Sequence, residues 1–207
     1  MAYFPFFVDI ADKKCIIYGG GKVAYRKIQA LLDFEADITV IAPAVSEEIA
    51  SLEGRIHISI GEYGEKEPED AFFVIAATNN AAVNAGIAKS CRERKILVNV
   101  VDELCECDFL FPAYLKRGPI SVGVTTSGRS PVMAGHIKKI ISDNLPDTYE
   151  TLVETLGSYR EYVRKNVPGE SERADIMKEL ARLGLAGNGE VTCMDVQDVI
   201  LKYKSKI

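Results

Sequence analysis

The sequence predicts an α/β protein with a Rossmann-type parallel sheet, then a small strand-helix module, then an all-helical C-terminal domain. Three observations predict this organisation. Apolar runs alternate with amphipathic segments over the first hundred residues, as in β-α-β units. A glycine-rich turn joins the first apolar run to the first amphipathic segment. Beyond residue 145 only helical patterns remain, and Pro and Gly separate them.

The elements of the predicted sheet follow in order along the first hundred residues. Strands are expected where runs are apolar throughout or alternate with polar residues, at residues 14–18, 37–42, 56–60, 72–77 and 96–101. Helices are expected where apolar residues recur every three or four positions, at residues 23–34, 45–52 and 80–94. A doubly wound sheet with helices on both faces follows from this order.

The regular alternation of strands and helices ends after residue 112. A strand is expected at residues 120–126, and helices at residues 131–144, 148–165, 171–183 and 195–204. The chain therefore divides into residues 1–112, a NAD-binding Rossmann domain; 113–145, a dimerisation and substrate module; and 146–207, a helical domain. A module of about thirty residues is too small for an independent core, so we expect it to pack on a second copy of the chain, which predicts a homodimer.

Composition narrows the class of protein. The 207 residues are 47% hydrophobic, enough for a substantial core, and the net charge of -5 argues against a nucleic-acid partner. No apolar run approaches the ~20 residues that cross a bilayer, so no membrane partner is expected. The five cysteines form no even, closely spaced framework, which predicts reduced thiols and a cytoplasmic protein.

The glycine turn predicts a dinucleotide site. Gly19, Gly21 and Ala24 fit the G-x-G-x-x-(G/A) fingerprint between a strand and a helix. Gly19 permits the tight turn, Gly21 lets the backbone approach a pyrophosphate, and Ala24 lets the helix pack closely. Lys22 and Val23 open the helix, whose N–H groups attract phosphates. The alternative is a structural turn that binds nothing.

The cofactor's type stays open from the residues alone. Where NAD sites usually carry an acid at the end of strand two, this chain has Ala42, Pro43 and Ala44, with no Arg or Lys for a 2′-phosphate. Backbone groups there are expected to contact the cofactor. Thr78 and Asn79, which end strand four, are expected to contact its ribose or nicotinamide. The alternative is that an asparagine caps the next helix.

Asp102, at the carboxyl end of the fifth strand, is the candidate catalytic base, because a carboxylate at this edge can accept a substrate proton. The alternative is a helix or turn cap. Cys105 and Cys107 lie among acids, but their spacing does not fit a closed zinc site, and we predict no metal site. Their thiols are interpreted as packed under a loop. His136 is interpreted as a surface or packing residue.

Residues 113–145 have the opposite charge to the whole chain, with five basic residues and one acid. Hydroxyls and an arginine precede the helix expected at 131–144, an arrangement that favours anion binding. The candidate substrate-binding residues are Ser127, Arg129, Ser130, Lys116 and Arg117. The alternative is a solvated basic face.

Taken together, these motifs resemble the precorrin-2 dehydrogenase/sirohydrochlorin ferrochelatase family, the N-terminal module of siroheme synthase. The resemblance covers residues 1 to about 145. Its motifs are Tyr3-Phe4-Pro5-Phe6-Phe7, Gly19-Gly20-Gly21-Lys22-Val23-Ala24 with Arg26-Lys27, Ala76-Ala77-Thr78-Asn79, Asn99-Val100-Val101-Asp102, Cys107-Asp108-Phe109-Leu110-Phe111-Pro112-Ala113 and Ser127-Gly128-Arg129-Ser130-Pro131.

The resemblance implies NAD-dependent oxidation of precorrin-2 to sirohydrochlorin in siroheme biosynthesis, by a dimer with intertwined middle modules. Asp102 matches the family's catalytic aspartate, and Ser127 falls in its substrate-side serine loop. Lys22-Val23 and Pro43-Ala44 fall where the family contacts NAD. Some members also insert Fe²⁺ into sirohydrochlorin and others only dehydrogenate, so chelation stays open. Two rivals remain: a dehydrogenase for a smaller substrate, and a non-catalytic NAD-sensing dimer.

Overall fold

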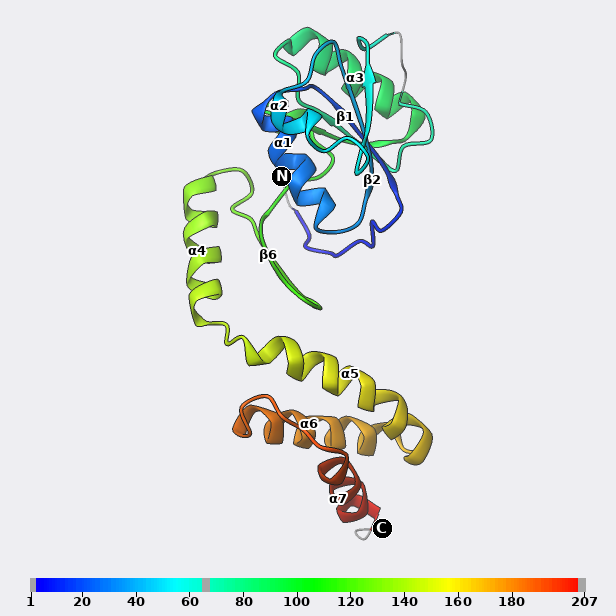
Figure 1. Ribbon diagram of the computed structural model, residues 1–207, viewed down its shortest axis with the longest axis vertical. Coiled ribbons are helices and arrows are strands. Elements are labelled where there is room, and N and C mark those ends of the chain that lie inside the picture. The colour runs from blue at the N-terminus through cyan, green and yellow to red at the C-terminus, as the bar shows by residue number, and fades with distance from the viewer. Residues whose placement is uncertain (1–2, 65–67, 205–207) are drawn as a thin grey trace. The chain divides into compact units, whose positions relative to one another are not determined.

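The computed structural model describes residues 3–64 and 68–204 (Figure 1). Contacts divide the chain into two compact units. The first comprises Met1–Phe111 with Thr125–Ser130, and the second comprises Pro112–Val124 with Pro131–Ile207. The middle module and the helical tail thus share one unit, except for one loop that belongs to the first. The three-part division stays a prediction, and its ends at residues 1–2 and 205–207 lie outside the described residues.

A five-stranded, wholly parallel sheet forms the first unit, which confirms the predicted Rossmann-type fold. Its strands are β1 (Lys14–Tyr18), β2 (Asp37–Ala42), β3 (His57–Ile60), β4 (Phe73–Ala76) and β5 (Leu97–Val100). Their order across the sheet is β3-β2-β1-β4-β5. The crossover between β3 and β4 places β1 and β4 at the centre, and both are buried almost throughout. This burial explains their continuous apolar sequences.

Helices cover both faces of this sheet (Figure 1). On one face, α1 (Lys22–Leu32) and the short α2 (Glu47–Ala50) contribute to one apolar cluster. On the other, α3 (Ala81–Arg94) contributes to a second cluster. Ala24 of α1 is fully buried against the sheet, so its small side chain allows the close helix–strand packing that the fingerprint predicts.

Residues 103–111 cover the free edge of β5. The 3₁₀ turn η1 (Leu104–Glu106) leads into a segment whose side chains bond to the strand's backbone. The Val98 N–H donates to Asp108 Oδ2 at 2.9 Å, and the Val100 N–H donates to Cys107 Sγ at 3.2 Å. Side chains therefore satisfy backbone groups that an edge strand leaves unpaired.

The second unit begins with an antiparallel hairpin of β6 (Ala113–Arg117) and β7 (Ile120–Val124), against which α4 (Pro131–Asn144) packs. The sequence predicted only the second of these strands. Its partner was missed because Tyr114 and Leu115 are adjacent apolar residues followed by two cations, which breaks the period-two pattern. The tight turn at Gly118, where φ is +47°, pairs the two strands.

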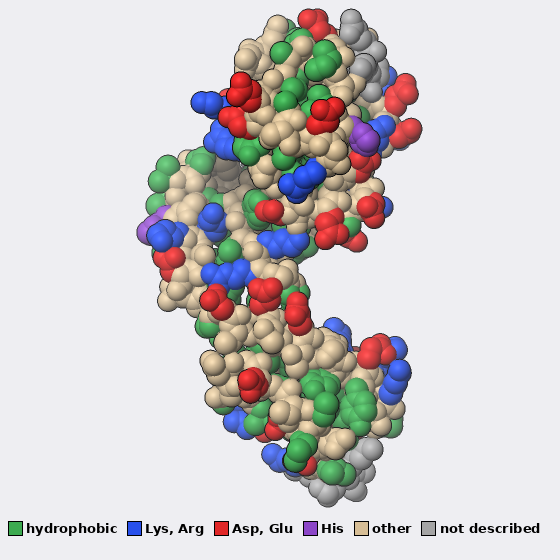
Figure 2. Space-filling model, in the orientation of Figure 1, with side chains coloured by type: hydrophobic (Ala, Val, Ile, Leu, Met, Phe, Trp, Pro, Cys, Tyr) green, Lys and Arg blue, Asp and Glu red, His purple; other side chains and the backbone are tan. Residues whose placement is uncertain are grey.

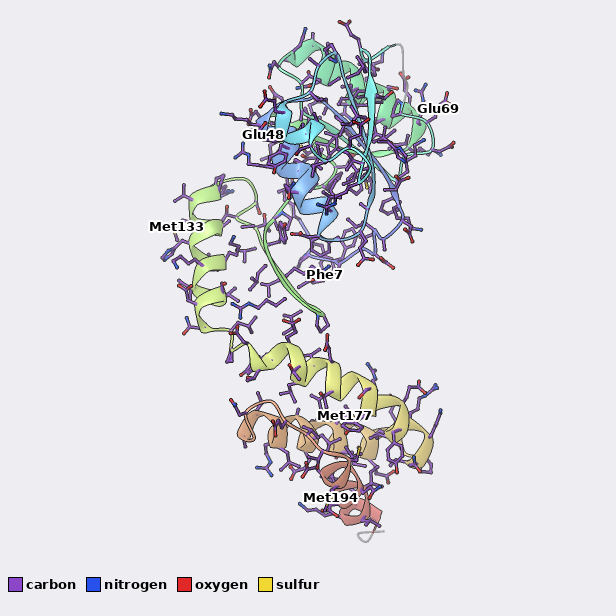
Figure 3. The ribbon with its side chains drawn as sticks, in the orientation of Figure 1. Phe7, Glu48, Glu69, Met133, Met177 and Met194 are labelled. Carbon is purple, nitrogen blue, oxygen red and sulfur yellow. The ribbon has the colours of Figure 1, made fainter. Side chains whose placement is uncertain are left out.

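Much of the outer face of α4 is apolar and exposed. Val132, Ile137 and Ile140 are 81%, 38% and 49% exposed. Met133 lies on the side of the helix that faces away from the hairpin (Figure 3). Hydrophobic side chains are also visible at the surface near the start of this helix (Figure 2). Of the described residues of α4, only Ala134 is buried.

Three helices complete the second unit and confirm the predicted helical tail: α5 (Thr148–Asn166), α6 (Glu170–Ala186) and α7 (Cys193–Lys204). Ile176 and Leu180, both fully buried, centre a core to which all three contribute. Among the described helices, none has the length and apolarity needed to cross a membrane. All five cysteines are free thiols, and burial raises the pKa of Cys15 to about 12.

Candidate functional site

The glycine turn lies where three loops meet at the carboxyl edge of the sheet. Gly19 has φ of +126°, and a Cβ at this position would collide with the carbonyl oxygen of Ala77, after β4. A Cβ on Gly20 would collide with the carbonyl oxygen of Ala44, after β2. Both positions therefore require glycine so that the turn can pack against its neighbours.

Gly21 differs from the other two glycines. It is the N-cap of α1 with φ of -98°, and a Cβ built there would meet nothing within 4 Å. The first N–H groups of a helix have no partner within it and carry partial positive charge. Lys22 is exposed at this terminus, and Val23 is half-buried. Open space beside free donors fits the pyrophosphate of a dinucleotide.

The loop after β2 carries no acid at the position expected for a NAD site. Ala42 is buried at the strand's end, and Pro43 and Ala44 are exposed. An acid does occur nearby, on α2: Glu48 (Figure 3), whose pKa is lowered chiefly by a hydrogen bond to its own backbone and also by the charge of Lys22. Glu48 lies on α2, beyond the strand end where the fingerprint places an acid, so the fingerprint does not indicate it.

The loop after β4 is fixed by side chains of α3. The Thr78 hydroxyl donates to Asn84 Oδ1 at 2.6 Å, and Asn84 Nδ2 donates to the Thr78 carbonyl at 3.1 Å. Asn80 caps α3, accepting from the Ala82 N–H at 2.9 Å. Asn79 is exposed between them. The amide of Asn84 is thus a positioning group that sequence reasoning missed, although a polar residue on a buried helical face was its signal.

Asp102 lies two residues after the end of β5 and is exposed. Its φ of +64° is a left-handed conformation that Asp tolerates better than most residues. The N-cap of η1 is Glu103, so Asp102 does not serve as that cap. Its carboxylate makes no hydrogen bond or ion pair with the part of the chain that the structure describes. A carboxylate without a structural partner is available as a proton acceptor.

The serine loop, residues 125–130, contacts the turn that follows Asp102. Gly128 has φ of +75°, and a Cβ there would lie 2.8 Å from Leu104 Cδ2, so this loop and η1 are in close contact. Ser127 also has a positive φ, of +54°. Arg129 is exposed beside it, ahead of α4. The structure therefore brings Asp102, Ser127, Arg129 and the neighbouring Ser130 into one compact unit with the glycine turn.

Lys116 and Arg117 belong to β6 of the second unit. The Arg117 guanidinium donates to the carbonyls of Leu145 at 2.6 Å and Ser142 at 3.2 Å, and it pairs with Asp147 at 2.9 Å. These bonds hold the hairpin to the corner between α4 and α5. Arg117 thus has a structural role here, while Lys116 is exposed.

The two thiols near Asp102 have different surroundings. Cys107 Sγ accepts from the Val100 N–H and lies 3.2 Å from the Val100 carbonyl oxygen, and its burial raises the pKa of this thiol. Cys105 and, on α4, His136 are exposed. Within residues 3–64 and 68–204, no three His, Cys, Asp or Glu side chains are grouped as metal ligands would be.

Comparison with known proteins identifies related chains. A family described as "Putative NAD(P)-binding" matches residues 6–113. The siroheme synthase of Methylococcus capsulatus is 37% identical over 214 residues, which cover 99% of this chain and 45% of that protein. The siroheme synthase of Photobacterium profundum is 34% identical over 182 residues, covering 87% and 39%. This chain therefore spans less than half the length of these relatives.

A solved structure is similar over the whole chain. The protein "SirC, precorrin-2 dehydrogenase" aligns with a TM-score of 0.72 and 25% sequence identity, covering 98% of this chain and 100% of that one. The parallel sheet, the hairpin with its helix and the helical tail are thus the parts of a known arrangement.

Proposed function

We propose that this chain, which belongs to the precorrin-2 dehydrogenase family of NAD(P)-binding proteins, oxidises precorrin-2 to sirohydrochlorin in siroheme biosynthesis. One observation carries the proposal beyond family membership. Asp102, whose carboxylate has no partner among the described residues, lies two residues before Leu104, which the serine loop contacts, and both belong to the same unit as the open glycine turn. A hydride acceptor, a proton acceptor and an anion-binding loop are the parts that this oxidation needs.

The glycine turn and its neighbours are the proposed NAD site. The N-terminus of α1 at Gly21, Lys22 and Val23 would hold the pyrophosphate, and Gly19 shapes the turn. Residues 42–44 would contact the adenosine half. Asn79 is exposed for contact with the nicotinamide half, and Asn84 fixes the loop through Thr78. When bound, NAD accepts a hydride from the substrate.

Asp102 is the proposed catalytic base. Removing a hydride from precorrin-2 leaves a proton to be lost, so that substrate and NAD⁺ give sirohydrochlorin, NADH and one H⁺. The exposed carboxylate of Asp102 can take this proton because no residue that the structure describes bonds to it. The same carboxylate would accept pyrrole protons if Fe²⁺ is inserted afterwards, so chelation is tested in the same experiment.

The serine loop, which carries Arg129, is the proposed substrate site. Precorrin-2 is a polycarboxylate, and Ser127, Ser130 and Arg129 offer hydroxyls and a guanidinium on the loop that contacts the turn after Asp102. Lys116 lies in the second unit and stays a candidate substrate-binding residue on sequence grounds, and Arg117 orders the hairpin that carries it. Local positive charge can bind an anionic substrate on a chain of net charge -5, because charges are screened beyond ~8 Å.

We also propose that the active form is a cytoplasmic homodimer. The exposed apolar residues of α4, Val132, Ile137 and Ile140, supply a surface for a second copy. The free thiols suit a reducing compartment.

An anaerobic assay with precorrin-2 and NAD tests the proposal. The expected result is stoichiometric NADH and sirohydrochlorin, both followed by absorbance. Fe²⁺ is then added, and siroheme formation above the protein-free rate would add chelation. NAD binding without NADH formation would instead favour the NAD-sensing dimer, and turnover of simple hydroxy acids would favour a dehydrogenase for smaller substrates.

A further inference from the structure

Lys27 of α1 is a half-buried cation with an aromatic neighbour. Its Nζ lies 3.9 Å from the centroid of the Phe111 ring. Among the residues that the structure describes, no carboxylate or other acceptor bonds to this ammonium. Burial is the main cause that lowers the pKa of Lys27 to about 8, the charge of Arg26 adds to it, and Cys107 opposes it.

Such a lysine is unusual, since buried cations are normally paired. The ring of Phe111 compensates part of the lost hydration through its π face. It accepts none of the three ammonium N–H donors in a conventional hydrogen bond. Below its pKa, Lys27 therefore carries a charge that no acidic side chain among the described residues neutralises, so it is available to an acceptor from outside the unit.

The position of Lys27 relates it to the candidate site. It lies six residues after Gly21, or about 9 Å along the helix. Phe111 belongs to the segment that follows Asp102 and packs on the sheet through Phe109, with ring centroids 5.7 Å apart. Cys107, which interacts electrostatically with Lys27, is bonded to the backbone of β5 just before Asp102.

We infer that Lys27 binds a carboxylate of the tetrapyrrole substrate, on the flank of the site formed by α1 and the segment after β5. The inference rests on the proposed function, which supplies a substrate with carboxylates around its rim. Lys27 would then be a second cationic group for the substrate, besides Arg129 of the serine loop, and its ammonium packs on the ring of Phe111. An acidic side chain of a second subunit is the competing acceptor, and the experiment separates the two.

The experiment measures the KM for precorrin-2 at pH 7 and pH 9, anaerobically, for the wild type, Lys27→Met and Lys27→Arg. Lys89→Met, which removes an exposed lysine of α3, is the matched control. Substrate carboxylates and arginine stay charged at both pH values. The charged and titratable groups that act on Lys27 are Arg26 and Cys107, and burial raises the pKa of the Cys107 thiol.

Lys27→Met is expected to raise the KM about tenfold at pH 7, the scale of one charge-assisted hydrogen bond, with little change in kcat. The wild-type KM is expected to rise from pH 7 to pH 9 as the ammonium loses its proton. Lys27→Arg should keep a similar KM at both pH values, which a purely structural role would not produce. NAD affinity should be equal in all four proteins.

If the wild type turns over precorrin-2 and neither Lys27→Met nor Lys27→Arg changes the KM, the inference about Lys27 is overturned and the proposed function stands. A monomeric Lys27→Met protein would overturn it in favour of the second subunit's carboxylate. If the variants are too unstable to assay, a wild-type KM that is flat between the two pH values overturns it as well. Absence of wild-type turnover would contradict the proposed function itself.

Discussion

At the scale of single residues, the three consecutive glycines serve different purposes. Gly19 and Gly20 are required by the fold, because a side chain at either would strike a neighbouring loop. Gly21 is required by nothing in the fold, because its backbone angle is ordinary and the space beside it is open. A glycine at a position where the fold has room for a side chain is explained by a ligand that approaches the backbone there.

Gly21→Ala is therefore expected to weaken NAD binding about tenfold or more, since the methyl group would fill the space that the pyrophosphate needs. The free energy of unfolding should change by less than about 1 kcal/mol, the scale of an N-cap replacement. Calorimetric titration with NAD and a thermal melt measure the two effects. Unchanged NAD affinity would remove this turn from the cofactor site.

Gly19→Ala is the contrasting control. It should destabilise the first unit by about 2–5 kcal/mol, because a positive-φ penalty adds to an overpacked contact.

Residue roles could be predicted where the local pattern determines them. The glycine fingerprint and the position of Asp102 after a strand follow from the order of residues along the chain. The bond between Thr78 and Asn84 could not be predicted, because it depends on how the loop after β4 turns back onto α3. The role of Arg117 at the α4–α5 corner depends likewise on partners 25 to 30 residues away.

At the scale of elements, the outer edge of β5 and the β6–β7 hairpin are covered in different ways. β5 has its edge covered by residues 107–111, whose side chains bond to its backbone. The hairpin of β6 and β7 is covered on one side by α4, which in turn exposes apolar residues. An exposed apolar helix face in a small module indicates an interface with another chain.

Ile140→Glu on α4 is expected to convert the proposed dimer to a monomer of 22.7 kDa, because a carboxylate would be buried in the proposed apolar interface. Sedimentation velocity measures the mass, and circular dichroism should show unchanged helix content. Val153→Glu on α5 makes the same replacement at a similarly exposed position, and we expect it to stay dimeric. A wild type that is already monomeric at micromolar concentration would contradict the prediction.

Among the elements, periodic segments were predictable and the β6 strand was not. The central strands β1 and β4 carry continuous apolar runs because both of the sheet's faces are covered, so their burial is visible in the sequence. β6 has intermediate burial at most of its positions and gains its structure from pairing with β7. Pairing with a neighbouring strand constrains the residue types of a strand less than burial does, so such a strand is harder to predict from sequence.

At the scale of the whole molecule, the chain passes between the two units more than once, so the order of segments along the sequence does not by itself show which unit each segment joins. After β7, residues 125–130 leave the second unit and join the first, where Gly128 contacts Leu104. The chain then returns to the second unit at Pro131. The order of residues along the chain indicates the serine loop and the acid separately, and this path places both in the first unit.

The central claim is that Asp102 accepts the substrate proton at a NAD site built on the glycine turn. The most direct test is single-turnover formation of NADH from precorrin-2 by Asp102→Asn, with NAD affinity measured in parallel. We predict that NADH formation falls by at least about 100-fold, the typical share of a general base, while NAD binds as in the wild type. NADH formation at the wild-type rate by this variant would contradict the account.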